Sequence, residues 1–125
     1  MPGSSFVPLD AEDVQVSVRL DGAVLHLTMS GSVETRDPGS LLDPYWDAMD
    51  DTLRREGVGM VELDISALDF MNSSGILTLV RWVMKVAARP AYQIVIRYDH
   101  EVAWQQTSLP VLARLAPEVV RVETR

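Results

Sequence analysis

A run of small polar residues, Asn72-Ser73-Ser74-Gly75, precedes a long apolar stretch and is the part of the sequence best suited to chemistry. Such residues at the start of a helix accept hydrogen bonds from backbone amides that have no partner within the helix. The same amides favour an anion, so the fold would tolerate a phosphate on a serine here while the surface changed. The spacing alone leaves two interpretations open, a helix cap and a phosphorylation site.

Histidines and carboxylates outside this turn form no pattern that suggests catalysis or metal binding. His26 falls in an expected strand and His100 in an expected turn, so both are interpreted as structural or exposed. Asp64 and Asp69 flank a loop, where hydrogen bonding is favoured over a pair of catalytic carboxylates. An enzyme needs a cluster of titratable groups. The sequence therefore favours a binding protein over an enzyme, with no cofactor and no metal.

Composition limits the possible partners and compartments. The chain has 125 residues, no cysteine, 11 basic and 18 acidic residues, and a net charge of -7. This acidic balance argues against binding of nucleic acid through charge, and the absence of cysteine excludes disulfides and thiolate metal sites. No apolar run reaches the roughly 20 residues that span a bilayer, and the first residues do not resemble a signal peptide. We expect a cytoplasmic protein with no membrane insertion and no evident small-molecule substrate.

The first part of the chain is expected to form a hairpin followed by a loop. Residues alternate between apolar and polar over 14–19 and again over 24–29. Asp21-Gly22 between them is a strong hairpin signal, so the two strands should pair antiparallel. Residues 31–43 are rich in turn-forming residues and predict a loop.

A helix and a strand are expected next. Asp43 as a cap, Pro44 at the first helical position and Gly57 after the last turn predict the helix. Period-two alternation over 60–65 then predicts a strand with one buried face. A short apolar piece over 68–71 leads to the serine turn.

The remainder of the chain is expected to alternate between helices and strands. These are a largely buried helix ending near residue 88, a strand over 92–97, a polar helix over 101–107, a short helical piece over 110–115 capped by Ser108, and an edge strand over 119–122. Trp82 lies within the first of these, either as a core residue or as a partly exposed anchor for a partner.

This order of elements predicts an α/β fold. An N-terminal antiparallel hairpin followed by alternating strands and helices favours a mixed β-sheet covered by helices. Residues 1–11 are expected to be a flexible N-terminal lead, and residues 12–125 a single domain.

The residues around the serine turn resemble the signature of the STAS domain, the domain of sulphate transporters and anti-sigma factor antagonists. Residues 61–76 read VELDISALDFMNSSGI. The family typically has a strand ending in Asp-Leu/Phe-Ser, a short apolar segment, and Asp-Ser-Ser/Thr-Gly-Leu/Ile opening a helix. Residues 102–115 are similar to the family's third helix and its Leu-Thr-Gly-Leu turn. The resemblance covers about residues 12 to 123 and implies a STAS-like mixed sheet.

The resemblance implies an anti-sigma factor antagonist that acts by partner switching in bacterial transcription regulation. In stand-alone members, the unphosphorylated protein binds a Ser/Thr kinase anti-sigma factor with a histidine-kinase-like ATPase domain and frees the sigma factor. The kinase phosphorylates the serine after the family's Asp, which corresponds to Ser73, with Ser74 as the alternative. A PP2C-type phosphatase reverses the modification. The residues implied to contact the partner are Asp69, Asn72, Ser73, Ser74, Gly75 and Ile76.

Asn72 departs from the family, which usually has Asp at this position. Asn caps a helix as well as Asp does, but the negative charge beside the serine is lost. Two alternatives stay open. Either Ser73 is phosphorylated within a variant set of partners, or the chain is a non-phosphorylated binding or scaffold subunit of a transporter, lipid-trafficking or sensory complex.

Overall fold

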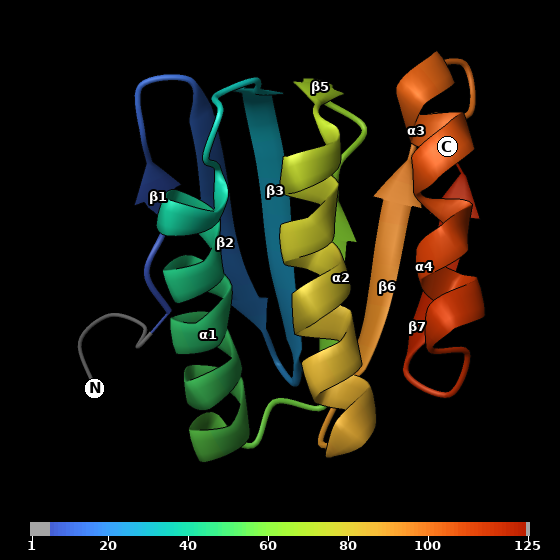
Figure 1. Ribbon diagram of the computed structural model, residues 1–125. Coiled ribbons are helices and arrows are strands. Elements are labelled where there is room, and N and C mark those ends of the chain that lie inside the picture. Colours follow the sequence, from blue (N-terminus) through green and yellow to red (C-terminus); the bar gives the residue numbers. More distant parts are fainter. Residues whose placement is uncertain (1–5, 125) are drawn as a thin grey trace.

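The computed structural model describes residues 6–124, and within them all helices lie on one face of a mixed sheet (Figure 1). The strands are β1 Leu9–Asp10, β2 Val14–Asp21, β3 Val24–Val33, β4 Met60–Asp64, β5 Leu68–Met71, β6 Gln93–Tyr98 and β7 Val120–Thr124. The helices are α1 Gly39–Glu56, α2 Ser73–Ala88, α3 Ala103–Ser108 and α4 Pro110–Leu115. No helix among these residues is long and apolar enough to cross a bilayer.

The sheet confirms the predicted mixed α/β fold. Its order is β1-β2-β3-β4-β6-β7, with antiparallel pairing from β1 to β3 and parallel pairing from β3 to β7. β5 pairs in parallel with the end of β3, beyond the point where β4 stops. The predicted alternation holds in β4, where Val61 and Leu63 are fully buried beneath the helices and Glu62 lies on the opposite face. Because β4 pairs with β3 on one side and β6 on the other, it is a central strand, which alternation alone did not predict.

Two stacked tryptophans join the helices that cover the sheet. The rings of Trp46 in α1 and Trp82 in α2 lie nearly parallel, with centroids 5.0 Å apart. The indole of Trp82 donates a hydrogen bond to the Tyr92 hydroxyl, which donates in turn to the carboxylate of buried Asp50 at 2.6 Å. Burial in this contact raises the pKa of the Tyr92 hydroxyl well above its usual value. Trp82 is 2% exposed, so it is a core residue.

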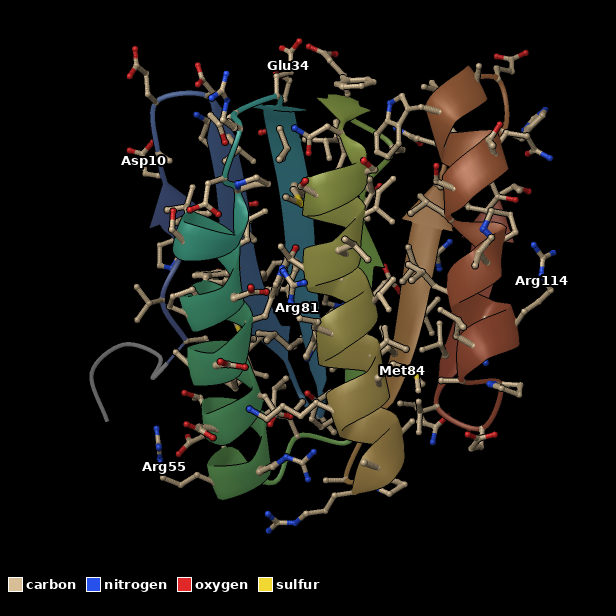
Figure 2. All side chains as sticks on the ribbon, viewed as in Figure 1. Asp10, Glu34, Arg55, Arg81, Met84 and Arg114 are labelled. Carbon is tan, nitrogen blue, oxygen red and sulfur yellow. The ribbon has the colours of Figure 1, made fainter. Side chains whose placement is uncertain are left out.

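Helix α1 begins earlier than predicted. It starts at Gly39, with Pro44 inside the helix, so the prediction that Asp43 caps it was wrong. Asp43 instead accepts two hydrogen bonds from Arg81 of α2, at 2.8 and 3.1 Å. Figure 2 shows Arg81 lying between the two helices. The end of α1 was predicted correctly, because Gly57 has φ +70° and its N–H bonds the Leu53 carbonyl.

Other boundaries also differ from the predictions. β3 continues to Val33, so the connection to α1 is much shorter than the loop expected over 31–43. Residues 68–71 are not merely an apolar connection but the strand β5. Ser108 ends α3 rather than capping α4, whose N-cap is Leu109. The hairpin turn lies at Gly22 and Ala23, because Asp21 still pairs with Val24.

Residues 1–11 were expected to be a flexible lead, but residues from Phe6 onward contact the rest of the domain. Phe6 is buried in the core, and Leu9–Asp10 pairs with β2. Residues 1–5 lie outside the described part of the chain. The remaining predicted strands and the buried helix were placed correctly, within a few residues at their ends.

Candidate functional site

Asn72 lies between the end of β5 and the start of α2 and ties three segments together. Its side-chain carbonyl accepts a hydrogen bond from the Gly75 N–H at 2.8 Å, which is the predicted helix cap. Its side-chain amide donates to the Thr35 carbonyl at 2.9 Å. Its backbone N–H donates to the Val33 carbonyl at 2.9 Å. Asn72 therefore fixes the start of α2 against the segment that leaves β3.

Ser73 and Ser74 occupy the first positions of α2 and are exposed. Within the described residues, neither hydroxyl has a hydrogen-bond partner. Their backbone N–H groups also have no partner there. The side chain of Asn72 accepts from the Gly75 N–H, and its backbone carbonyl accepts from the Ile76 N–H. No acidic side chain lies in the first turn of this helix. The site thus presents a hydroxyl beside two amides that an anion could accept from.

Gly75 allows the start of α2 to pack closely on the sheet. It is buried, and a Cβ atom here would lie 2.8 Å from side-chain atoms of both Met71 and Val33. Such a contact is too short, so a larger residue would push the helix start outward. The glycine of the predicted motif therefore serves packing and sets where the two serines lie.

An open, partly apolar hollow of about 600 Å³ lies beside the serines. Phe70 from β5 is 41% exposed and makes an edge-to-face contact with Trp104 from α3, with ring centroids 6.4 Å apart. Ile76 lies half-buried at the same place. The hollow is lined by Phe70, Met71, Asn72, Ser73, Ile76, Ala103, Trp104, Thr107 and Ser108. Trp104 is partly buried, and aromatic side chains such as these two are enriched at protein interfaces.

Helix α3 is held in place by one buried side chain. The amide of Gln105 donates to the carbonyls of Ile65 and Leu68, both at 3.0 Å, and its oxygen accepts from the Asp99 N–H. The neighbouring Trp104 indole donates to the Asp69 carbonyl at 2.9 Å. These bonds orient the aromatic pair relative to the serines.

The structure brings together the residues that the motif singled out. Asn72, Ser73, Gly75 and Ile76 meet at the start of α2, and Ser74 lies exposed next to them. Asp69 lies nearby with an exposed side chain and contributes its carbonyl to Trp104.

Of the remaining titratable candidates, Asp64 and His26 have structural partners and His100 is exposed. Asp64 accepts hydrogen bonds from the N–H and the hydroxyl of Ser66, at 2.9 and 2.6 Å, as expected for a loop. His26 lies 3.4 Å from Glu62 on the open face of the sheet. No group of three or more potential metal ligands occurs in residues 6–124.

Comparison with known proteins was made at the level of sequence and of structure. No protein-family model matches the sequence, and no curated protein matches it. Among solved structures, an anti-sigma factor antagonist from Mycobacterium paratuberculosis superimposes with a TM-score of 0.63 at 18% identity, over 87% of this chain and 88% of that one. An anti-sigma factor antagonist STAS domain from Rhodobacter sphaeroides gives 0.51 at 18% identity, over 68% and 86%. This chain has the STAS fold.

A third solved structure matches over the whole chain. It is a chain from the complex of the diguanylate cyclase SiaD with its activator SiaC from Pseudomonas aeruginosa, with a TM-score of 0.63 at 15% identity, over 100% of this chain and 98% of that one. The fold that the motif implied is thereby confirmed.

Several residues of the site were not predicted from the sequence. Phe70 and Trp104 are separated along the chain, and only the pairing of β5 and the position of α3 bring their rings together. An aromatic residue in an otherwise polar helix was the signal that could have pointed to Trp104. The contact of Thr35 could not have been predicted from its residue type, because Asn72 bonds its backbone carbonyl and not its side chain.

Proposed function

We propose that this chain is a regulatory protein of the anti-sigma factor antagonist type, which binds a protein partner through the start of α2. The observation that carries the proposal is an exposed Ser73, with no acidic neighbour in the first turn of its helix, beside the exposed Phe70 ring and the partly buried Trp104 ring. The hollow supplies apolar contact area, and the serine supplies a place where charge can be added. The structural likeness to two anti-sigma factor antagonists supports the same class of function.

The proposed partner is a Ser/Thr kinase anti-sigma factor in the cytoplasm of a bacterium, with a PP2C-type phosphatase as the opposing enzyme. Phosphate on Ser73 brings a charge near -2. The two available amides of α2 offset part of that charge, so the fold is retained. In the interface, the phosphate must be desolvated and also enlarges the side chain beside Phe70. Binding is therefore lost on phosphorylation and restored on its removal.

The experiment that tests the switch uses two variants of Ser73. Ser73→Ala is expected to fold and to bind the partner constitutively, whereas Ser73→Asp weakens binding, in part because one carboxylate has less charge than a phosphate. After incubation with the kinase and ATP, mass spectrometry is expected to find phosphate on Ser73 and not on Ser74. A chain without phosphate on either serine, or equal affinity of both variants, contradicts the switch.

A second function is favoured by the hydrogen bonds of Asn72. Its amide donates to the Thr35 carbonyl, a bond that the family's usual Asp could not make when ionised. Asn72 therefore has a structural use that does not depend on kinase recognition. The alternative proposal is a STAS binding or scaffold subunit that is not phosphorylated, for which partner affinity would be unchanged by kinase and ATP. Recovery of transporter or sensory components with the purified chain, in place of a kinase, supports this alternative.

A further inference from the structure

β7 (Val120–Thr124) forms a long edge of the sheet and pairs only with β6 among the described residues. The opposite edge is the short strand β1, which has 2 residues, whereas β7 has 5. An edge strand carries backbone groups that can pair with another strand. β7 is therefore the part of the sheet best suited to extension by a further chain.

The backbone groups that β7 directs outward can be assigned from its pairing. The Val119 carbonyl accepts a hydrogen bond from the Ile94 N–H at 2.8 Å, so it is directed toward β6. Successive residues of a strand direct their backbone groups to opposite edges. Arg121 and Glu123 therefore bond toward β6, and the N–H and C=O groups of Val122 and Thr124 are directed away from it.

The side chains of β7 are complementary to themselves across a two-fold axis. Arg121 and Glu123 lie on the open face of the sheet, where they form an ion pair at 3.0 Å within the chain and their side chains are 63% and 34% exposed. If two β7 strands pair antiparallel about Val122, Arg121 lies opposite the partner's Glu123, and this pair occurs twice. Opposite charges placed in this way stabilise a strand pair, whereas like charges destabilise it. Val122 lies opposite its own copy, with the outward backbone groups that such a pair exchanges.

Helix α4 leaves apolar side chains uncovered beside this edge. Val111 is 37% and Leu115 is 43% exposed, while Leu112 on the same helix is fully buried. Ala113 packs partly against the core. Figure 2 shows Arg114 directed away from α2, on the outer side of the molecule. A two-fold pairing of β7 strands would place the two copies of α4 next to each other, over the joined edge, where Val111 and Leu115 can be covered.

We propose that this chain forms a homodimer through β7 and α4, with the two sheets joined into one. The dimer rests on the outward backbone groups of β7, the two Arg121–Glu123 pairs and the apolar side of α4. It leaves the start of α2 exposed, so each copy keeps its own serine site. The proposal is independent of the function proposed for that site.

Charge reversal tests the dimer, with sedimentation equilibrium of the full chain over a range of concentrations as the measurement. The wild-type chain is expected to dimerise. Arg121→Glu and Glu123→Arg each place like charges opposite one another and are expected to raise the dissociation constant at least tenfold. The double variant R121E/E123R restores opposite charges and is expected to recover most of the affinity.

Mixing supplies the sharpest comparison. R121E carries only acidic side chains at these two positions and E123R only basic ones, so a mixture is expected to form a heterodimer more readily than either variant self-associates. Arg19→Glu, on β2 at the far side of the sheet, makes the same charge change as R121E and should leave dimerisation unchanged. A wild-type chain that stays monomeric, equal dimerisation of all variants, or a mixture without heterodimer overturns the proposal.

Discussion

Asn72 is the residue on which the position of the serine site depends. One side chain caps α2 through the Gly75 N–H and holds the Thr35 carbonyl, and the backbone N–H bonds Val33. The cap was predictable from the sequence, because it depends on residues three apart. The bond to Thr35 was not, because it joins positions 37 apart whose approach depends on the end of β3.

Substitution of Asn72 separates its two side-chain roles. Asn72→Asp keeps the cap but loses the donor to Thr35, and is expected to lower the free energy of unfolding by about 1 kcal/mol. Asn72→Ala loses both bonds and is expected to cost about 2 kcal/mol. Urea unfolding at neutral pH measures both. Wild-type stability in the Asp variant would show that the amide bond to Thr35 contributes nothing.

Phe70 supplies the exposed ring beside Ser73, and its removal should affect binding more than folding. Phe70→Ala is expected to weaken partner binding about tenfold, which corresponds to about 1.4 kcal/mol. Leu20→Ala is the matched control, because Leu20 is 45% exposed on β2, away from the site. Titration calorimetry with the partner distinguishes them. Equal losses in both variants would contradict a role for the hollow in binding.

At the scale of elements, the site depends on the extension of β3 past the end of β4. Its last residues pair with β5, with a shift in register at Gly31, and this brings Val33 next to Asn72. The sequence predicted a loop here because residues 30–33 include Gly and Ser, which are typical of turns. The start of α1 was misplaced because Asp43-Pro44 matches the usual signal, while the actual N-cap, Pro38, makes no side-chain hydrogen bond.

Within this extension of β3, replacement of Gly31 is expected to reduce stability most. It has φ +92°, and a Cβ atom would overlap the backbone carbonyl of Asp13. Gly31→Ala is therefore expected to lower the free energy of unfolding by about 3 kcal/mol, from backbone strain and overlap together. Gly59→Ala is the control, because Gly59 has open space around it and no positive φ. Thermal unfolding that ranks the two variants equally would contradict this account of the β3 end.

At the scale of the molecule, one face of the sheet is covered by helices and the other is open and charged. Glu62, Arg97 and Glu123 form ion pairs across neighbouring strands on the open face. A hydrogen bond from Arg97 lowers the pKa of the Glu62 carboxyl. The alternation of apolar and polar residues predicted this two-sided sheet. The order of its strands was not predictable, because the parallel pairs join segments that lie far apart in the sequence. The strand β5 was also too short to be recognised.

Two tyrosines, the buried Tyr92 and the partly buried Tyr45 of α1, make stability depend on alkaline pH. Burial raises the pKa of Tyr45 from 10.0 to about 12, and that of Tyr92 is raised as well. The unfolded chain loses these protons first, so the stabilisation is complete below pH 10 and decreases as the pH rises toward 12. Urea unfolding across this range should give a falling free energy, with a smaller fall for Tyr45→Phe. A constant free energy, or an equal fall in the variant, would contradict the assignment.

The claim that phosphate on Ser73 controls partner binding is tested most directly with the modified chain itself. Phosphoserine is installed at position 73, and the affinity for the proposed kinase anti-sigma factor is measured by titration calorimetry against the unmodified chain. The same modification at position 74 is the matched control. The proposed switch predicts at least tenfold weaker binding for phosphoserine at 73 with an unchanged thermal midpoint. Equal affinity of the modified and unmodified chains would contradict it.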